Sequence, residues 1–113
     1  MTSLQQTTLP YTREVDKNTL VHKLERHQKD LLQLRLKLNS YICEPKTYTH
    51  FERIETLKHA LENLRSENAY ILVTLKERNG KMEDYAERIK KQLQQFKALQ
   101  YKVEEYIKGV RNY

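Results

Sequence analysis

The sequence predicts an all-α protein built from coiled-coil helices, and three observations support this fold class. The 113 residues include only two Gly and two Pro, which leaves few positions for tight turns. Charged residues make up 32% of the chain, a proportion typical of long helices that pack side by side. Apolar residues also recur at alternating spacings of three and four, which is the heptad pattern of a coiled-coil seam. We therefore expect an antiparallel helical hairpin that runs into a long coiled-coil helix.

The first 13 residues lack this pattern. They are polar and rich in Thr and Gln, and Pro10 lies near their end. A segment without a periodic apolar face cannot bury enough surface to offset the entropy lost on ordering. We expect residues 1–13 to be a disordered tail.

The first helix is predicted over residues 14–43. Asp16 is a suitable N-cap, because its side chain can accept a hydrogen bond from a free backbone N–H of the first turn. Glu44-Pro45 should end the helix, since proline disfavours helical geometry at the residue before it. The seam of this helix comprises Leu20, Leu24, His27, Leu31, Leu34, Leu38 and Tyr41.

The second helix is predicted to begin at residue 49 and to continue to residue 111. Thr49 with Glu52 three residues later fits a capping box, in which side chains and backbone N–H groups satisfy each other. Residues 44–48 form a loop so short that the two helices should lie antiparallel. From Ile54 onward the 3–4 spacing continues through eight heptads.

Asn79-Gly80 interrupts this second stretch and leaves two arrangements open. The dipeptide could form a turn, which would give an up-down-up three-helix bundle. Alternatively, the helix could continue, since the heptad phase carries across the dipeptide and Gly80 falls on the outer face, where it costs about 1 kcal/mol relative to Ala. Lys81 and Met82 also offer no good N-cap for a new helix. These arguments favour the continuous helix, with a break at 79–80 as the alternative.

A continuous helix would determine where partners bind. The first helix would end opposite residues near Lys76, so the seam after that point would have no partner within the chain. A long exposed apolar stripe marks an interaction surface. The residues predicted to bind partner helices are Met82, Tyr85, Ile89, Leu93, Phe96, Leu99, Val103, Tyr106 and Ile107.

Three polar residues fall on the second seam: Asn68, Arg78 and Gln92. A polar side chain in an apolar seam costs stability, but it disfavours registers and partners that leave it unpaired. We expect these three residues to select register or partner. The alternative is that the seam is loosely packed and hydrated at these positions.

A stretch without acidic residues, from Arg88 to Val103, supplies a candidate basic surface. Its cations are Arg88, Lys90, Lys91, Lys97 and Lys102. The formal net charge of +6 favours acidic partners. Phe96 and Tyr101 are interleaved with these cations, but Phe96 belongs to the seam, which removes one of the two aromatic side chains from any stacking platform, so we do not expect nucleic-acid binding.

No catalytic, metal-binding or cofactor-binding motif is present in the sequence. Two glycines cannot build a phosphate-cradling loop, and the four histidines do not have the spacing of HExxH. Cys43 and His50 could approach each other across the loop, but zinc requires three or four ligands. We therefore predict no enzymatic activity, no metal and no cofactor.

These features predict a structural or adaptor subunit, a coiled-coil scaffold within a multi-protein assembly that binds partner helices as a homo- or hetero-oligomer. The alternatives are a monomeric three-helix-bundle binding protein or chaperone-like cofactor, and a basic helical binder of nucleic acid or microtubules. A single cysteine predicts a reducing compartment. No apolar run approaches the roughly 20 residues that span a bilayer. We expect a cytoplasmic protein. Association with the cytoskeleton or an organelle, or a nuclear location, also fits these features.

Overall fold

The computed structural model describes the backbone of residues 2–77 and 82–113, and the side chains of residues 18–76 and 85–113. Three long helices and one short 3₁₀ helix make up this part of the chain, and it contains no strand, so the all-α prediction is confirmed. The elements are α1 (Thr2–Leu38), η1 (Tyr41–Cys43), α2 (Tyr48–Glu77) and α3 (Met82–Arg111).

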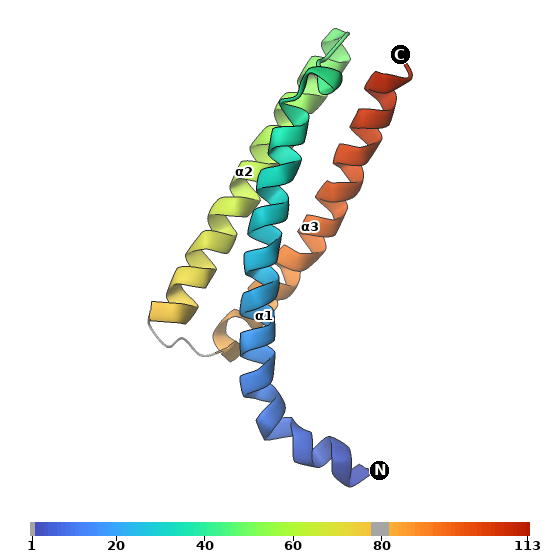
Figure 1. Ribbon diagram of the computed structural model, residues 1–113. Helices are drawn as coiled ribbons and strands as arrows, with labels where there is room; N and C mark the ends of the chain where they lie inside the picture. Colours follow the sequence, from blue (N-terminus) through green and yellow to red (C-terminus); the bar gives the residue numbers. More distant parts are fainter. Residues whose placement is uncertain (1, 78–81) are drawn as a thin grey trace.

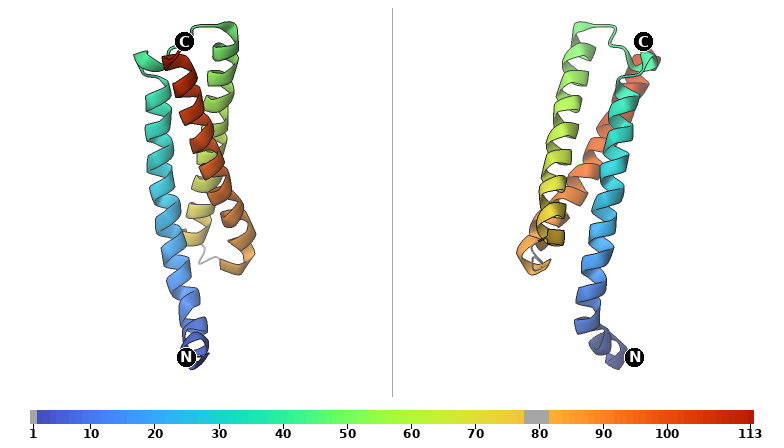
Figure 2. Two further views of the ribbon diagram at one scale, coloured as in Figure 1. Left: turned by 90° about the vertical axis from the view of Figure 1, so that its right-hand side faces the viewer. Right: turned by 60° about the vertical axis from the view of Figure 1, so that its left-hand side comes forward.

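The three long helices run side by side as an up-down-up bundle (Figures 1 and 2). α1 and α3 run in the same direction, and α2 runs antiparallel to both. Each long helix packs against the other two, and η1 packs against α3. The chain end after α3 therefore lies beside the connection between α1 and α2 (Figure 1).

The predicted continuous helix over 49–111 is wrong. At 1.5 Å per residue such a helix would be about 95 Å long, whereas the longest dimension of the protein is 57 Å. Gln92 Nε2 donates a hydrogen bond to Asn68 Oδ1 at 2.9 Å, although 24 residues separate them in sequence. Such a contact requires α3 to fold back along α2. The dipeptide Asn79-Gly80 lies outside the described residues.

Energetics explains why the chain folds back. A single continuous helix would leave the apolar seam of its second half in water, and each large apolar side chain gains about 1.5–3 kcal/mol on burial. The free-energy cost of closing a short loop is far smaller than the gain from burying many such side chains. The continuity of the heptad phase does not discriminate between the two arrangements. A reversal that takes up about one heptad, between Leu75 and Met82, leaves both seams in phase.

The ends of α1 differ from the prediction. The helix begins at Thr2, so residues 2–13 are helical where a disordered tail was expected, and Asp16 lies inside the helix instead of capping it. At the other end α1 stops at Leu38, five residues before the predicted end. There the Ser40 hydroxyl donates to the carbonyl oxygen of Lys37 at 2.7 Å. A serine that bonds local backbone in this way offers an alternative to the helical ladder.

The N-terminus of α2 is capped by Thr47, two residues before the predicted cap. The His50 backbone N–H donates to Thr47 Oγ1 at 3.0 Å, which satisfies one free donor of the first turn. His50 Nδ1 in turn accepts a hydrogen bond from the Lys46 backbone N–H at 3.3 Å. The His50 ring thus bonds the backbone N–H of the residue before the cap, whereas the Glu or Gln of a capping box accepts from the N–H of the cap residue itself.

The buried apolar side chains form two separate clusters. The large cluster fills the half of the bundle next to the α1–α2 connection, and the small cluster fills the other half. The large cluster comprises Leu31, Leu38, Cys43, Ile54, Leu57, Leu61, Leu64, Phe96, Leu99, Val103, Tyr106, Ile107 and Val110. The small cluster comprises Leu24, Ile71, Leu72, Leu75 and Ile89.

Candidate interaction surface and buried polar layer

Most residues predicted to bind partners are part of the protein's own core. Six are at most 7% exposed, and these are Ile89, Phe96, Leu99, Val103, Tyr106 and Ile107. Tyr85 and Leu93 are partly buried against the small cluster, and the side chain of Met82 lies outside the described residues. The premise that this seam lacks an intrachain partner is therefore wrong, because α1 and α2 cover it.

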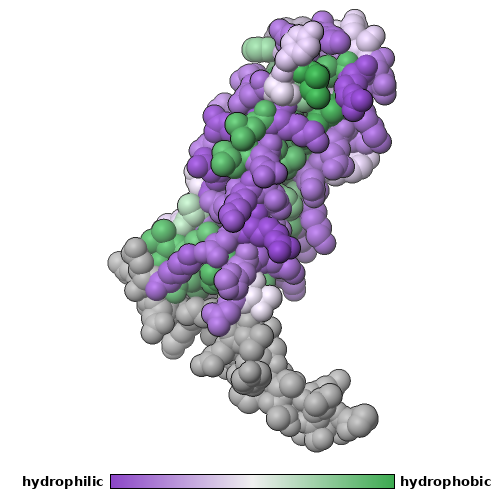
Figure 3. Space-filling view, viewed as in Figure 1, coloured by the Kyte–Doolittle hydropathy of each residue, from purple (hydrophilic) through white to green (hydrophobic). Residues whose placement is uncertain are grey.

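Ten large apolar and aromatic side chains are exposed among the described residues, and five of them lie around the α1–α2 connection. We call these five residues the connection-end surface. They are Tyr41, Ile42, Tyr48, Phe51 and Tyr113, each between 51% and 86% exposed. Figure 3 shows apolar patches among hydrophilic side chains, one of them near this end of the bundle.

Local structure explains why these side chains point outward. Tyr41 was predicted to lie on the seam, but α1 ends before it, so its heptad position no longer applies. η1 buries only Cys43, which leaves Tyr41 and Ile42 exposed. Tyr48 and Phe51 lie three residues apart in the first turns of α2 and hence on one face of that helix.

Side chains of α3 hold the α1–α2 connection in place from the core side. The hydroxyl of Tyr106, a residue only 2% exposed, donates to the backbone carbonyl of Cys43 at 2.9 Å. The ring of His50 makes edge contacts with the rings of Tyr106 and Tyr113, with centroids 6.1 and 5.3 Å apart. Side chains from α2 and α3 thus fix the position of η1, which gives the connection-end surface a defined shape.

A shallow hollow on this surface combines apolar and charged side chains. Tyr41 and Ile42 line it together with Glu44, Lys46 and Arg111. Tyrosine is favoured at protein interfaces because its ring packs while its hydroxyl stays hydrated. An apolar centre with a charged rim is the usual anatomy of a protein–protein interface.

A buried polar layer crosses the middle of the bundle. Asn68 on α2 is fully buried, and Gln92 on α3 is 5% exposed. Their side chains share the hydrogen bond described above, so the two predicted seam amides pair with each other within the chain, and their role in selecting register stays a prediction. Arg78, the third residue predicted for this role, lies outside the residues whose side chains are described.

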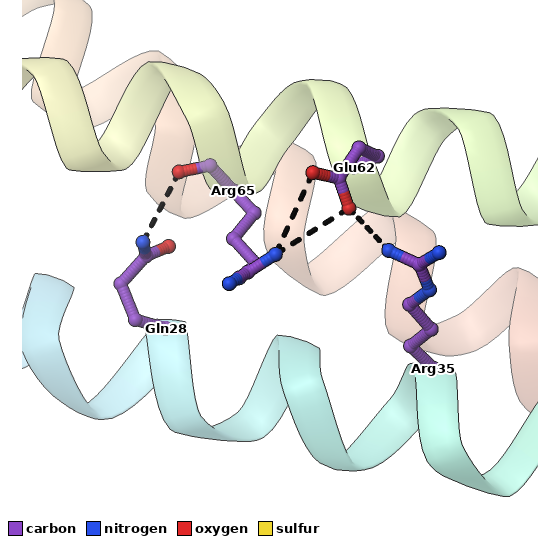
Figure 4. Close-up of polar contacts among 4 residues, drawn as sticks. All are labelled: Gln28, Arg35, Glu62 and Arg65. Atoms are coloured by element: carbon purple, nitrogen blue, oxygen red, sulfur yellow. Dashed lines mark hydrogen bonds and ion pairs between the residues drawn. The ribbon is translucent and has the colours of Figure 1, made fainter.

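α1 contributes two further polar side chains to this layer, His27 and Gln28. Gln28 Nε2 donates to the carbonyl oxygen of Arg65 at 3.1 Å. The ring of His27 stacks on Phe96, with centroids 4.0 Å apart. Figure 4 shows Gln28 beside Arg65 and, further along, Glu62 between Arg65 and Arg35, so polar contacts flank the α1–α2 interface.

Burial lowers the pKa of His27 below its ordinary value of 6.5, because the charged imidazolium loses hydration. Asp30 on α1 opposes this change, whereas Lys23 and Arg26 on α1 and Lys97 on α3 lower the pKa further. His27 Nδ1 is also buried without a hydrogen-bond partner. The folded state therefore favours neutral His27.

Acid should destabilise the bundle through His27. The pKa of His27 is lower in the folded state than in the unfolded state, so the unfolded state binds more protons. The contribution of neutral His27 to stability is therefore present above pH 6.5 and is lost as pH falls through 6.5 toward the folded-state pKa. His27→Phe removes the titration and keeps an aromatic ring against Phe96. We expect the free energy of unfolding in urea to fall more steeply for the natural chain than for this variant between pH 8 and pH 5. Parallel curves would contradict this assignment.

The predicted basic surface is divided between two sides of α3. Arg88 pairs with Glu67 at 3.0 Å, and its guanidinium lies 5.5 Å above the ring of Tyr70. Lys91 and Lys102 line hollows between α2 and α3. Lys97, by contrast, lies close enough to His27 to act on its pKa from the α1 side. Lys90 is exposed on the outer side of α3.

This division predicts weak nucleic-acid binding without sequence preference. Only phosphate neutralisation is available, so affinity for DNA or RNA should fall steeply as salt is raised from 50 to 200 mM. Fluorescence anisotropy with single- and double-stranded oligonucleotides of several sequences measures this. Tight, sequence-selective binding at physiological salt would favour the nucleic-acid alternative instead.

Three further features of the described residues concern metals, thiols and membranes. Among the described residues, no group of three or more His, Cys, Asp or Glu side chains is arranged to hold a metal ion. Cys43 is fully buried and carries a free thiol. No helix in the described part of the chain is long and apolar enough to cross a bilayer.

No protein-family model matches the chain, and no curated protein or solved structure is significantly similar to it.

Proposed function

We propose that the chain is a non-enzymatic helical-bundle protein that binds other proteins and acts as an adaptor or structural subunit of a multi-protein assembly. The observation that supports this proposal is the connection-end surface, where five large apolar or aromatic side chains are exposed around the α1–α2 connection, two of them lining one hollow. Such a group is costly to leave in water and usually marks an interaction site.

The closed intrachain core modifies the original expectation about how partners bind. Because α1, α2 and α3 bury one another's seams, the described core closes within one chain. We therefore favour a small binding protein that presents a preformed surface, and we place the partner contact on the connection-end surface instead of the α3 seam. A reducing compartment such as the cytoplasm suits the free thiol of Cys43.

Photo-crosslinking can find the partner and test the surface together. A photoreactive phenylalanine analogue replaces Tyr48 on the connection-end surface or, as a control, Tyr70 on the outer face of α2, both of which are exposed. We expect a discrete crosslinked protein from the Tyr48 position and not from the Tyr70 position. Equal crosslinking from both positions would argue against a specific surface.

Affinity for the purified partner then provides the decisive measurement. The variant Ile42→Ser/Phe51→Ser should bind at least about tenfold more weakly, because an interface hot spot contributes roughly 2 kcal/mol or more and 1.4 kcal/mol is tenfold in affinity. The control variant Tyr70→Ser/Val73→Ser removes the same kind of exposed side chain from the outer face of α2 and should bind like the natural chain. Equal losses in both variants, with melting temperatures unchanged, would refute the proposed surface.

A further inference from the structure

The buried polar layer separates the two apolar clusters in all three helices. On α1, His27 and Gln28 lie between Leu24 of the small cluster and Leu31 of the large cluster. On α2, Asn68 lies between Leu64 and Ile71. On α3, Gln92 lies between Ile89 and Phe96. The two apolar cores are therefore joined through a layer of polar side chains.

This layer is incompletely satisfied. The single hydrogen bond between Gln92 and Asn68 leaves Asn68 Nδ2 buried without an acceptor. Gln28 Oε1 is likewise buried without a donor, and so is His27 Nδ1. A buried polar atom that lacks a partner loses its hydration without compensation, so exposure of the layer to water recovers free energy.

The two clusters also differ in size. Among the residues whose side chains are described, five buried residues form the small cluster and thirteen form the large one, and Leu20, Val21, Tyr85 and Leu93 pack partly buried against the small cluster. Local stability follows the number of buried apolar contacts, so the part of the bundle around the small cluster requires less free energy to open. Salt bridges do little to offset this difference. The ion pair between Lys76 and Glu25, at this end, is exposed to solvent and contributes little.

We propose that the bundle contains a built-in opening unit: the half around the small cluster separates at the polar layer while the half around the large cluster stays folded. In the open state Leu24, Ile71, Leu75 and Ile89 would become accessible, and Asn68 and Gln92 would be hydrated. The connection-end surface belongs to the half that stays folded, so this opening is independent of the surface proposed for partner binding.

Hydrogen exchange of the full chain under native conditions tests the opening unit. Amides of residues 71–76 and 87–91 should exchange at least about tenfold faster than those of residues 57–64 and 99–106. Uniform protection of the four segments would overturn the proposal without any variant.

A double variant separates the effect of the polar layer from simple fraying at a helix end. Asn68→Leu/Gln92→Leu replaces the amide pair with apolar side chains and should join the two clusters into one core. We expect exchange of residues 71–76 and 87–91 to slow toward the rate of the large-cluster segments. The control Asn63→Leu/Gln94→Leu adds the same side chains at exposed positions of the same helices and should leave the exchange pattern unchanged.

Two outcomes of the variant experiment would count against the polar layer as the cause. If amides of residues 71–76 and 87–91 exchange as fast in Asn68→Leu/Gln92→Leu as in the natural chain, the small-cluster half frays for reasons unrelated to the polar layer. If the double variant loses cooperative unfolding or speeds exchange throughout the chain, the amide pair is required for the whole fold. Either result would overturn the proposal, even where the natural chain shows two exchange rates.

Discussion

Ending the chain after Glu77 should abolish cooperative unfolding. The truncation removes Phe96, Val103, Tyr106 and Val110 from the large cluster. Each large apolar side chain contributes about 1.5–3 kcal/mol when buried, so the combined loss approaches or exceeds the roughly 5–15 kcal/mol of stability that a typical domain possesses. We expect circular dichroism of the truncated chain to show weak helical signal and no sigmoidal thermal transition.

A peptide covering residues 82–113, supplied in trans, provides the control for this truncation. If α3 acts as one wall of the core, adding this peptide should restore helical signal and a cooperative transition. The same peptide with Val103→Asp should not restore them, because a carboxylate would enter a fully buried position. A truncated chain that melts cooperatively without the peptide would show that α1 and α2 form a stable hairpin by themselves.

The sequence was sufficient to predict the helical fold class and most residues of the core, although Tyr41, predicted for the seam of α1, is 86% exposed. Seam residues predicted from the 3–4 spacing, such as Leu24, Leu31, Ile54 and Val103, are at most 2% exposed in the structure. This success has a simple physical cause. The spacing of apolar residues along a helix fixes which face must be buried, whichever helix covers it.

The sequence could not determine which helix covers which. In a continuous helix the second-half seam would pack against a partner chain, and in a bundle it packs against α1 and α2. Periodicity alone therefore does not distinguish the continuous helix from the bundle. The scarcity of N-cap residues near Met82 favoured continuity, but a missing cap affects stability by only about 1 kcal/mol. Burial of Ile89, Phe96, Val103 and Val110 has a far larger effect, and it decides the topology.

The candidate surface was predicted poorly for the same reason. Heptad spacing marks the seam of α3, whereas no periodic pattern marks the exposed residues near the connection. Tyr48 and Phe51 lie outside both seams and could have been noticed as large aromatic side chains at positions where a helix meets water. The polar layer, in contrast, could be anticipated from Asn68 and Gln92. The contribution of Gln28 depends on the packing of α1 against α2, which no seam pattern specifies.

Substituting two adjacent leucines of α1 should have sharply different effects. Leu31→Ala should destabilise the protein by about 2–5 kcal/mol, because Leu31 is 1% exposed and its loss leaves a cavity in the large cluster. Leu32→Ala should change stability by less than about 0.5 kcal/mol, since Leu32 is 46% exposed. Urea denaturation of both variants measures the two free energies of unfolding under identical conditions.

This pair of variants tests the orientation of α1 with little interference from other effects. Both substitutions exchange the same residue types at adjacent positions of one helix, so changes in helix propensity and in the unfolded state nearly cancel in the comparison. What remains is the difference in burial. Equal losses would mean that α1 is rotated or covered by a second chain, and dimerisation measured by sedimentation would then distinguish these two explanations. A large loss for Leu31→Ala alone requires the face of α1 that carries Leu24, Leu31 and Leu38 to point into the bundle.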